Sequence, residues 1–150
     1  MFDKQQIIPI ACDHGGYEMK EFLRLKLGKL GYLIKDMGTF SEESVDYPDF
    51  IHPLAKSIND GEYLLGIILC GSGNGAQMTA NKYSNVRAAL CWSIEQAHLA
   101  REHNNANIIS LPGRFIDKEL AMEIALEFIH TEFEGGRHQR RVEKISKVLK

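Results

Sequence analysis

The 150-residue sequence is 44% hydrophobic and 25% charged, which predicts a single domain, 1–150, with a sizeable apolar core. Its formal net charge of −2 gives no overall basic field, so binding to nucleic acid or to a membrane surface is not favoured. No charged leader precedes an apolar run, and no apolar stretch approaches the roughly 20 residues that cross a bilayer, which predicts a cytoplasmic protein with three reduced cysteines.

Short apolar runs alternate with segments of helical period along most of the chain, which is typical of a parallel sheet covered by helices on both faces. The apolar runs predict five strands, at residues 7–12, 32–36, 64–70, 86–91 and 108–111. The sequence therefore predicts an α/β fold built on a five-stranded parallel sheet.

Three segments have the spacing of amphipathic helices. The first contains Met19, Phe22, Leu23, Leu27 and Leu30, and it is followed by Gly31, a residue favoured at a left-handed helix end. The second begins at a capping box of Ser93 and Gln96, and the third begins behind Asp117 with a stripe of Leu120, Ala121, Ile124, Ala125, Phe128 and Ile129. The polar stretch 38–48 predicts a long loop at the edge of the sheet.

Chemically useful residues follow three of the predicted strands: Cys12-Asp13-His14-Gly15-Gly16, Cys70-Gly71-Ser72-Gly73-Asn74-Gly75 and Pro112-Gly113-Arg114. Ligands of parallel sheets bind beyond the carboxyl ends of the strands, so we expect these residues to share one site. A glycine-rich turn into a helix exposes backbone N–H groups that can hold a phosphate or a developing oxyanion. The turn lacks the Gly-Lys-Ser/Thr ending of a P-loop, and its third glycine comes one residue early for a dinucleotide fingerprint, which disfavours a nucleotide.

Cys70 lies between a strand end and a helix start, where the positive end of the helix stabilises a thiolate. Alternatively, all three cysteines are small buried apolar residues, and we expect this of Cys12 and Cys91. Only Cys70 precedes the glycine-rich turn. Its chemistry alone leaves both a functional and a structural role open.

The segment from Gly135 to Arg141 leads into a last predicted helix, whose apolar stripe comprises Val142, Ile145, Val148 and Leu149. Arg141 falls inside this stripe and Arg137 at its margin, so the two guanidinium groups are placed to grip one phosphate; the alternative is a solvated basic terminus. His52, His98 and His130 are left unassigned. No metal site is predicted, because there is no Cys-x-x-Cys pair and His98 and His103 are one residue too far apart for an i, i+4 pair.

Taken together, these motifs resemble the ribose-5-phosphate isomerase B family of sugar-phosphate isomerases. The resemblance is carried by Cys-Asp-His-Gly-Gly, Asp46-Tyr47-Pro48, Cys70-Gly-Ser-Gly-Asn-Gly, Ala80-Asn81-Lys82, Arg101-Glu-His-Asn104 and Gly135-Gly-Arg-His-Gln-Arg-Arg141, in order over nearly the whole chain. It implies a Rossmann-like three-layer sandwich without a metal or organic cofactor. It also implies a homodimer, or a dimer of dimers, with active sites shared between subunits and a C-terminal helix exchanged with or packed on the partner.

The resemblance also implies a role for each matching residue in a conversion of ribose 5-phosphate to ribulose 5-phosphate, a step of the pentose phosphate pathway. Cys70 would be the base, His103 would open the sugar ring, and Asp13 would assist or position hydroxyl groups. The enediolate would be stabilised by Ser72 and the amides of Gly71, Gly73, Asn74 and Gly75. Phosphate would bind His14, Arg137 and Arg141, and the pocket would be completed by Tyr47, Asn104 and Arg114.

Two departures from the family pattern bear on these roles. Ala76 stands where one branch of the family has a glutamate base, which leaves Cys70 as the matching candidate. Asn105-Ala106 replace the Asp-Thr often found there, which leaves the substrate open between ribose 5-phosphate and a six-carbon sugar phosphate such as galactose 6-phosphate or allose 6-phosphate. A third hypothesis, from the glycine-rich turn and basic terminus alone, is a non-catalytic module that binds phosphate or a nucleotide.

Overall fold

A computed structural model describes residues 1–147 of the chain. It contains one five-stranded sheet in the order β2-β1-β3-β5-β4, and every neighbouring pair is parallel. The strands are β1 (Ile7–Cys12), β2 (Leu33–Asp36), β3 (Gly66–Cys70), β4 (Ala88–Leu90) and β5 (Ile108–Pro112). All five predicted strands are confirmed. The fourth is shorter than the predicted 86–91, because the amide of Val86 closes a turn onto the carbonyl of Tyr83 instead of pairing in the sheet.

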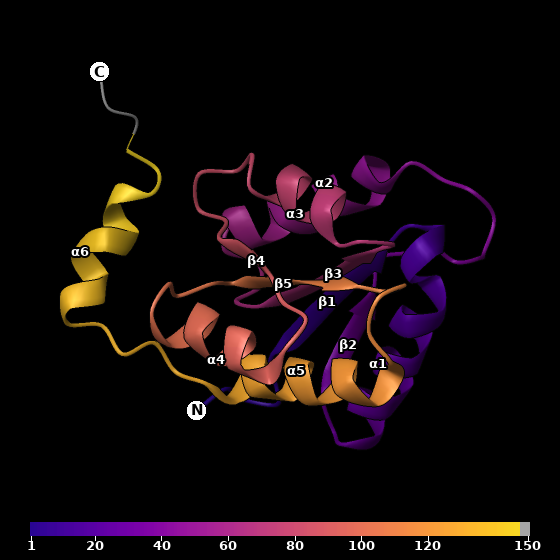
Figure 1. Ribbon diagram of the computed structural model, residues 1–150, viewed down its shortest axis with the longest axis horizontal. Coiled ribbons are helices and arrows are strands. Elements are labelled where there is room, and N and C mark those ends of the chain that lie inside the picture. Colours follow the sequence, from indigo (N-terminus) through magenta and orange to yellow (C-terminus); the bar gives the residue numbers. More distant parts are fainter. Residues whose placement is uncertain (148–150) are drawn as a thin grey trace.

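Helices cover both faces of this sheet (Figure 1). One face carries α1 (Tyr17–Lys29), α4 (Ile94–Glu102) and α5 (Lys118–His130), and the other carries α2 (Tyr47–Asn59) and α3 (Asn74–Ala80). A short 3-10 turn, η1 (His14–Gly16), precedes α1, and α6 (Arg137–Lys144) follows α5. The predicted three-layer, Rossmann-like α/β sandwich is confirmed.

The core is divided by the alternation of side chains along the central strands. In β1, Ile8, Ile10 and Cys12 are fully buried toward α1 and α5, whereas Ala11 is buried toward α2. In β3, Cys70 belongs to the α2–α3 side of the core. The thiols of Cys12 and Cys70 therefore lie on opposite faces of the sheet.

The predicted helix boundaries are explained by capping contacts. Gly31 follows α1 with a φ of 91°, the left-handed conformation expected there. The Ser93 hydroxyl accepts a hydrogen bond from the Gln96 amide at 3.2 Å, and the Asp117 carboxylate accepts one from the Leu120 amide at 2.7 Å. These side chains satisfy amides that have no partner inside the helix.

The loop after the edge strand β2 is shorter than the predicted 38–48. Helix α2 already begins at Tyr47, because Pro48 lies in its first turn, where a missing N–H costs nothing and the fixed φ of proline suits a helix. The loop therefore ends at Asp46.

Helix α6 stands apart from the sandwich (Figure 1). Ile145, which follows it, is 58% exposed, and Arg137 and Arg141 are exposed as well. Val148 and Leu149, which complete the predicted apolar stripe, lie outside the described residues. The packing of this helix on a partner stays a prediction. Within residues 1–147, no helix combines the length and apolar character needed to cross a membrane.

Candidate active site

The loops after β1, β3 and β5 meet at the carboxyl edge of the sheet. β1 and β3 are neighbours there, but the next strand after β1 lies on one side of the pair and the next strand after β3 lies on the other. The amide of Gly113 donates to the carbonyl of Cys70 at 2.9 Å, and the amide of Arg114 donates to the carbonyl of Gly71 at 3.0 Å. A Cβ atom added to Gly15 would lie 3.0 Å from the nitrogen of Gly71. The loops approach so closely that a side chain at Gly15 would crowd the backbone of Gly71. They meet at the switch point of the sheet, where the sequence predicts the site, and we call this meeting point the crevice.

Asp13 anchors the first of these loops. Its side chain is buried, and its Oδ1 accepts hydrogen bonds from the amides of Gly15 at 2.9 Å and Gly16 at 3.2 Å, which caps η1. Because Oδ1 is held by the loop, Oδ2 is the oxygen that Asp13 can offer to a ligand.

His14 is oriented by the loop after β2. Its Nδ1 accepts a hydrogen bond from the Val45 amide at 3.2 Å, so the proton of a neutral ring lies on Nε2. Nε2 is then a donor, which is the role that phosphate binding requires.

The Cys70 thiol lies under the glycine-rich turn and is only 4% exposed. The amide of Gly73 donates to its Sγ at 3.2 Å, and Gly73 adopts a left-handed φ of 77° in doing so. Burial raises the pKa of both Cys12 and Cys91 to about 12, although Lys20 partly offsets this at Cys12. All three cysteines are free, and only Cys70 combines a hydrogen-bond donor on sulfur with a place in the crevice.

Two further predicted residues flank the turn. A Cβ atom added to Gly75 would lie 2.5 Å from Cζ of Tyr47, so the Tyr47 ring packs directly on the turn. A Cβ atom added to Gly71 would lie 3.3 Å from Nη1 of Arg114, so this guanidinium covers the other side. Ser72 accepts a hydrogen bond from the amide of Asn74 at 3.3 Å, which leaves its hydroxyl proton free to donate.

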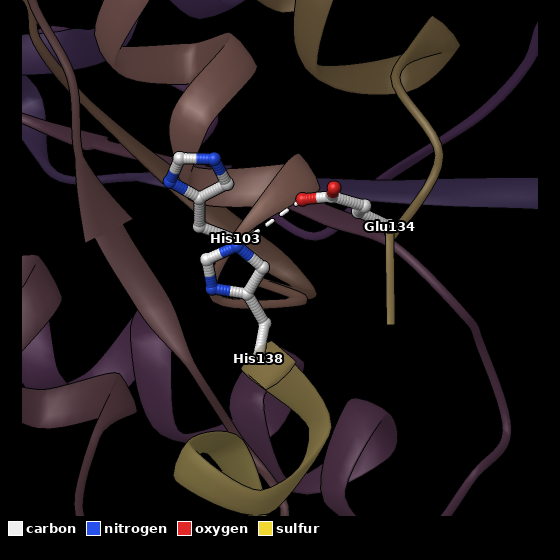
Figure 2. Close-up of side chains that lie close together, drawn as sticks. All are labelled: His103, Glu134 and His138. Atoms are coloured by element: carbon white, nitrogen blue, oxygen red, sulfur yellow. Dashed lines mark ion pairs between the residues drawn. The ribbon is translucent and has the colours of Figure 1, made fainter. Parts of the chain in front are cut away.

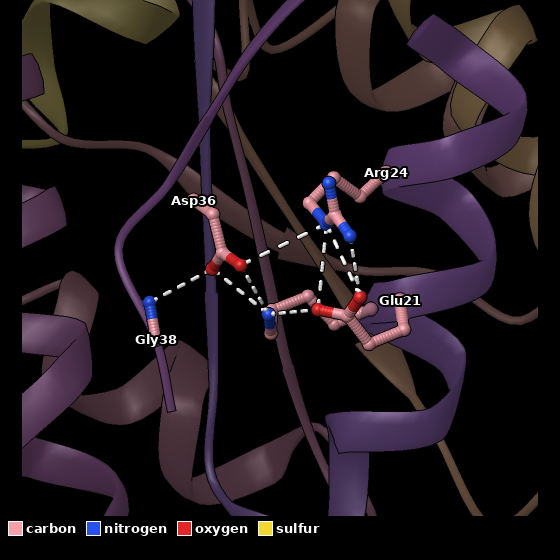
Figure 3. Close-up of polar contacts among 5 residues, drawn as sticks. Glu21, Arg24, Asp36 and Gly38 are labelled. Carbon is pink, nitrogen blue, oxygen red and sulfur yellow. Dashed lines mark hydrogen bonds and ion pairs between the residues drawn. The ribbon is translucent and has the colours of Figure 1, made fainter. Parts of the chain in front are cut away.

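A buried lysine that was not predicted from the sequence, Lys20, belongs to a network of polar contacts with Glu21, Arg24, Asp36 and Gly38, the four residues labelled in Figure 3. The Nζ of Lys20 is fully buried and lies 2.8 and 2.9 Å from the two carboxylate oxygens of Asp36 and 2.8 Å from Glu21. Asp36 in turn accepts a hydrogen bond from the Gly38 amide at 3.0 Å, and the Gly38 carbonyl accepts one from the Cys12 amide at 2.7 Å. This chain of contacts fixes the backbone next to Asp13.

Opposing effects act on the charges of this network. Burial alone would lower the pKa of Lys20, but the carboxylates of Asp36 and Glu21 outweigh it and raise that pKa. Hydrogen bonds from Arg24 and then from Lys20 lower the pKa of Glu21 to about 2. A signal was present in the sequence, since Lys20 shares the spacing of Leu23 and Leu27 on the apolar side of α1.

The remaining predicted residues lie elsewhere. His103 and Asn104 follow α4 and lead into the start of β5, at the amino edge of the sheet, whereas Cys70 pairs with Pro112 at the carboxyl edge. The four residue steps along β5 alone separate the two edges by about 13 Å. A single chain therefore brings together Cys70, Asp13, His14, Tyr47, Arg114 and the turn, and it does not bring His103 or Asn104 to them.

His103 instead joins a second cluster with Glu134 and His138 (Figure 2). The two imidazole rings stack with centroids 4.2 Å apart and planes 11° from parallel. The Glu134 carboxylate lies 3.1 Å from Nε2 of His138, and Glu102 lies 3.2 Å from Nε2 of His103. Arg137 and Arg141 belong to the same helix as His138. This cluster was not predicted, because the nearest other histidine to His103 in the sequence is His98, whereas Glu134 and His138 follow 31 and 35 residues later.

A parallel α/β sheet with a glycine-lined crevice at its switch point, holding a thiol, a carboxylate and cationic donors, defines a class of proteins that act on small phosphorylated or hydroxylated ligands. The particular family follows from comparison with known proteins. Residues 8–145 match the Ribose/Galactose Isomerase family model, and the chain belongs to this family. The resemblance inferred from the motifs is thereby confirmed.

Similarity to individual members extends over nearly the whole chain. The sequence is 37% identical over 141 residues to ribose-5-phosphate isomerase B of Escherichia coli, covering 94% of this chain and 95% of that protein. The crystal structure of a ribose 5-phosphate isomerase from Thermotoga maritima is 50% identical, with a TM-score of 0.93 over 95% of this chain and 99% of that one. Ribose-5-phosphate isomerase B from Mycoplasma genitalium with bound ribulose-5-phosphate is 39% identical, with a TM-score of 0.89 over 94% of both chains.

Proposed function

We propose that this protein is an aldose-ketose isomerase that interconverts ribose 5-phosphate and ribulose 5-phosphate, with Cys70 as the base. The observation that carries the proposal is the Gly73 amide donating to Sγ of Cys70 at 3.2 Å inside the crevice. Relatives with this activity in their names match 94% of the chain, and one of their structures holds ribulose-5-phosphate. Reduced thiols such as Cys70 persist in the cytoplasm, where we place the reaction.

The crevice supplies the groups that this reaction needs. Moving a proton between C1 and C2 builds negative charge on oxygen, so the base must be accompanied by donors that stabilise an enediolate. Ser72 and the amides of Gly71 and Gly75 are such donors, whereas the amides of Gly73 and Asn74 already donate to Cys70 and Ser72. The turn leads into α3, whose first amides have no partner within the helix. Asp13 positions the sugar hydroxyl groups through Oδ2, while Nε2 of His14 and the guanidinium of Arg114 bind anionic oxygen.

A second copy of the chain supplies the remaining groups in this proposal. His103, Asn104, Arg137 and Arg141 lie away from Cys70 in one chain, yet the chemistry needs an acid to open the sugar ring and cations to hold the phosphate. In a homodimer with two composite sites, the partner's amino edge and α6 would face the Cys70 crevice. The uncovered apolar residue Ile145 suits a contact of this kind.

A six-carbon sugar phosphate is the second candidate substrate, favoured by the family's description as isomerases of ribose and galactose. The two substrates differ in length by one CHOH unit, so a few pocket contacts decide between them. The ratio of kcat/KM for ribose 5-phosphate and galactose 6-phosphate measures this preference. A higher kcat/KM for galactose 6-phosphate would make the six-carbon sugar phosphate the preferred substrate.

The deciding experiment compares the wild type with Cys70→Ala on ribose 5-phosphate in the presence of EDTA. We expect metal-independent turnover that falls by about 10²- to 10⁴-fold in the variant, the usual contribution of a positioned base. Cys91→Ala is the matched control, because Cys91 is also a buried thiol just beyond a strand end but lies outside the crevice. Turnover that survives in Cys70→Ala would place the base elsewhere. No turnover of either the five-carbon or the six-carbon sugar phosphate would favour a non-catalytic phosphate-binding module.

A further inference from the structure

His103, Glu134 and His138 form the one group of three or more potential metal ligands that residues 1–147 bring together. One donor atom from each residue lies within 4.8 Å of the other two (Figure 2). Two imidazole nitrogens and one carboxylate oxygen are a donor set that suits Zn²⁺ and its neighbours in the first transition row, whereas Mg²⁺ and Ca²⁺ prefer oxygen ligands alone.

A second observation also indicates a missing ligand. His138 is only 6% exposed, and its Nε2 is the single buried side-chain nitrogen or oxygen within the described part of the chain that makes no hydrogen bond. The carboxylate of Glu134 is 3.1 Å away, but the contact does not have hydrogen-bond geometry. Because a buried polar atom left without a partner destabilises the fold, a coordinate bond to this nitrogen would remove that penalty.

The charge of the cluster selects a cation over an anion. Glu134 contributes a carboxylate on one side and Glu102 lies 3.2 Å from His103 on the other, so a phosphate placed between the rings would meet two negative groups. From these contacts we propose that His103, Glu134 and His138 bind one divalent transition-metal ion of the Zn²⁺ type.

Coordination needs only small movements of accessible groups. Tetrahedral Zn²⁺ with bonds of about 2.1 Å keeps its ligand atoms about 3.4 Å apart, so donors that now lie within 4.8 Å of one another must close by up to about 1.4 Å. The nitrogen lone pairs of two stacked parallel rings lie in two parallel planes and cannot point at one ion, so the ring of His103 must also turn. Its side chain is 35% exposed, which leaves it room to do so. Glu134 is followed by Gly135 and Gly136, both at positive φ, in a turn that carries the carboxylate and His138 toward one another.

Occupation of this site affects activity through His103. If His103 opens the sugar ring, as the proposed function holds, an ion bound to it inhibits isomerisation, and a chelator restores activity. Binding of the ion does not depend on the proposed function, so an experiment can disprove the metal site without disproving the isomerase activity, and the reverse.

The direct test is titration of Zn²⁺ into EDTA-treated full-length protein by calorimetry, with Co²⁺ as a spectroscopic probe of the ligands. We expect one ion per chain and the visible spectrum of four-coordinate Co²⁺ without a thiolate charge-transfer band. Glu134→Gln and His138→Gln should each weaken binding by at least about 10-fold, the lower end of what even an outer-shell change costs at a metal site. Glu132→Gln is the matched control, because among residues 1–147 that exposed carboxylate pairs only with the N-terminus.

Unchanged affinity in Glu134→Gln and His138→Gln, or a thiolate band that indicates Cys70 as a ligand, would overturn the site. The second arm measures isomerisation in Zn²⁺ before and after EDTA, using Glu134→Gln, which keeps His103 intact and should keep its basal rate. Inhibition of the wild type that is relieved by EDTA and lost in Glu134→Gln supports the proposal. Equal inhibition of both proteins would mean that the ion acts elsewhere.

Discussion

The amide of Gly113 donates a hydrogen bond to the carbonyl of Cys70 at 2.9 Å, so the turn after β5 is tied directly to the residue that we propose as the base. The same glycine lies against the first loop, since a Cβ atom added to it would be 2.9 Å from the carbonyl oxygen of Gly15 and 3.1 Å from Cα of Gly16. Every one of these neighbours is backbone. Gly113 therefore fixes the loops after β1, β3 and β5 against one another.

Gly113→Ala tests this role. The added methyl group must push backbone apart, so we expect a loss of about 1–3 kcal/mol in the free energy of unfolding, as for other overpacked sites. The displaced crevice should lower kcat/KM for ribose 5-phosphate by at least about 10-fold, because misplacement by about 1 Å costs up to 100-fold. Gly28→Ala is the control: nothing lies within 4 Å of its added Cβ in α1, so it should gain up to about 1 kcal/mol and keep full activity.

Alkylation distinguishes the three thiols. The pKa of Cys12 and of Cys91 is raised to about 12 by burial, so neither forms much thiolate at neutral pH. We expect iodoacetamide to label the native protein once, at Cys70, and to label it more slowly when ribulose 5-phosphate is present. Intact mass measured on the wild type and on Cys70→Ala gives the count, and comparable labelling of Cys12 or Cys91 would contradict the assignment.

The fold was predictable from the sequence because its signals are local. Apolar runs of strand length, helical spacing in α1 and α5, and side-chain caps at Ser93 and Asp117 each fix an element within a few residues. The order of the strands in the sheet was not predicted. It depends on which apolar faces pack together, and this information is spread over the whole chain.

The crevice was predictable for a related reason: residues that follow neighbouring parallel strands meet at one edge. The cluster of His103, Glu134 and His138 was not, because α4 and the segment before α6 are brought together only by tertiary packing. Lys20 was missed because a lysine on a helix is usually solvated, and nothing local shows that Asp36 lies opposite it.

Lys20→Met removes the cation from the buried network. The carboxylates of Asp36 and Glu21 then lose one of two shared partners, since Arg24 stays 2.7 Å from Glu21 and 3.8 Å from Asp36. We expect the free energy of unfolding to fall by about 3 kcal/mol, the lower part of the range for breaking a buried pair, because both carboxylates keep Arg24 and some contact with water. KM for the sugar phosphate should rise as well, because Asp36 holds Gly38 and Gly38 holds Cys12. Chemical denaturation and steady-state kinetics measure the two effects. Lys29→Met, an exposed lysine of the same helix, is the control, and equal behaviour of the two variants would show that the buried pair contributes nothing.

Acid should weaken the fold through Glu21. Hydrogen bonds from Arg24 and Lys20 lower the pKa of this carboxyl from 4.5 to about 2, so the native state releases its proton more readily than the unfolded chain does. A group whose pKa is lower in the folded state stabilises the fold fully at pH values above its unfolded-state pKa. This stabilisation is lost as the pH falls through its folded-state pKa. The free energy of unfolding should therefore decline between about pH 4.5 and pH 2, and Glu21→Gln should decline less over that window while starting from a lower value. Urea denaturation at several pH values measures both slopes, with Glu18→Gln as an exposed control on the same helix. Parallel slopes for the wild type and Glu21→Gln would mean that other carboxylates govern acid unfolding.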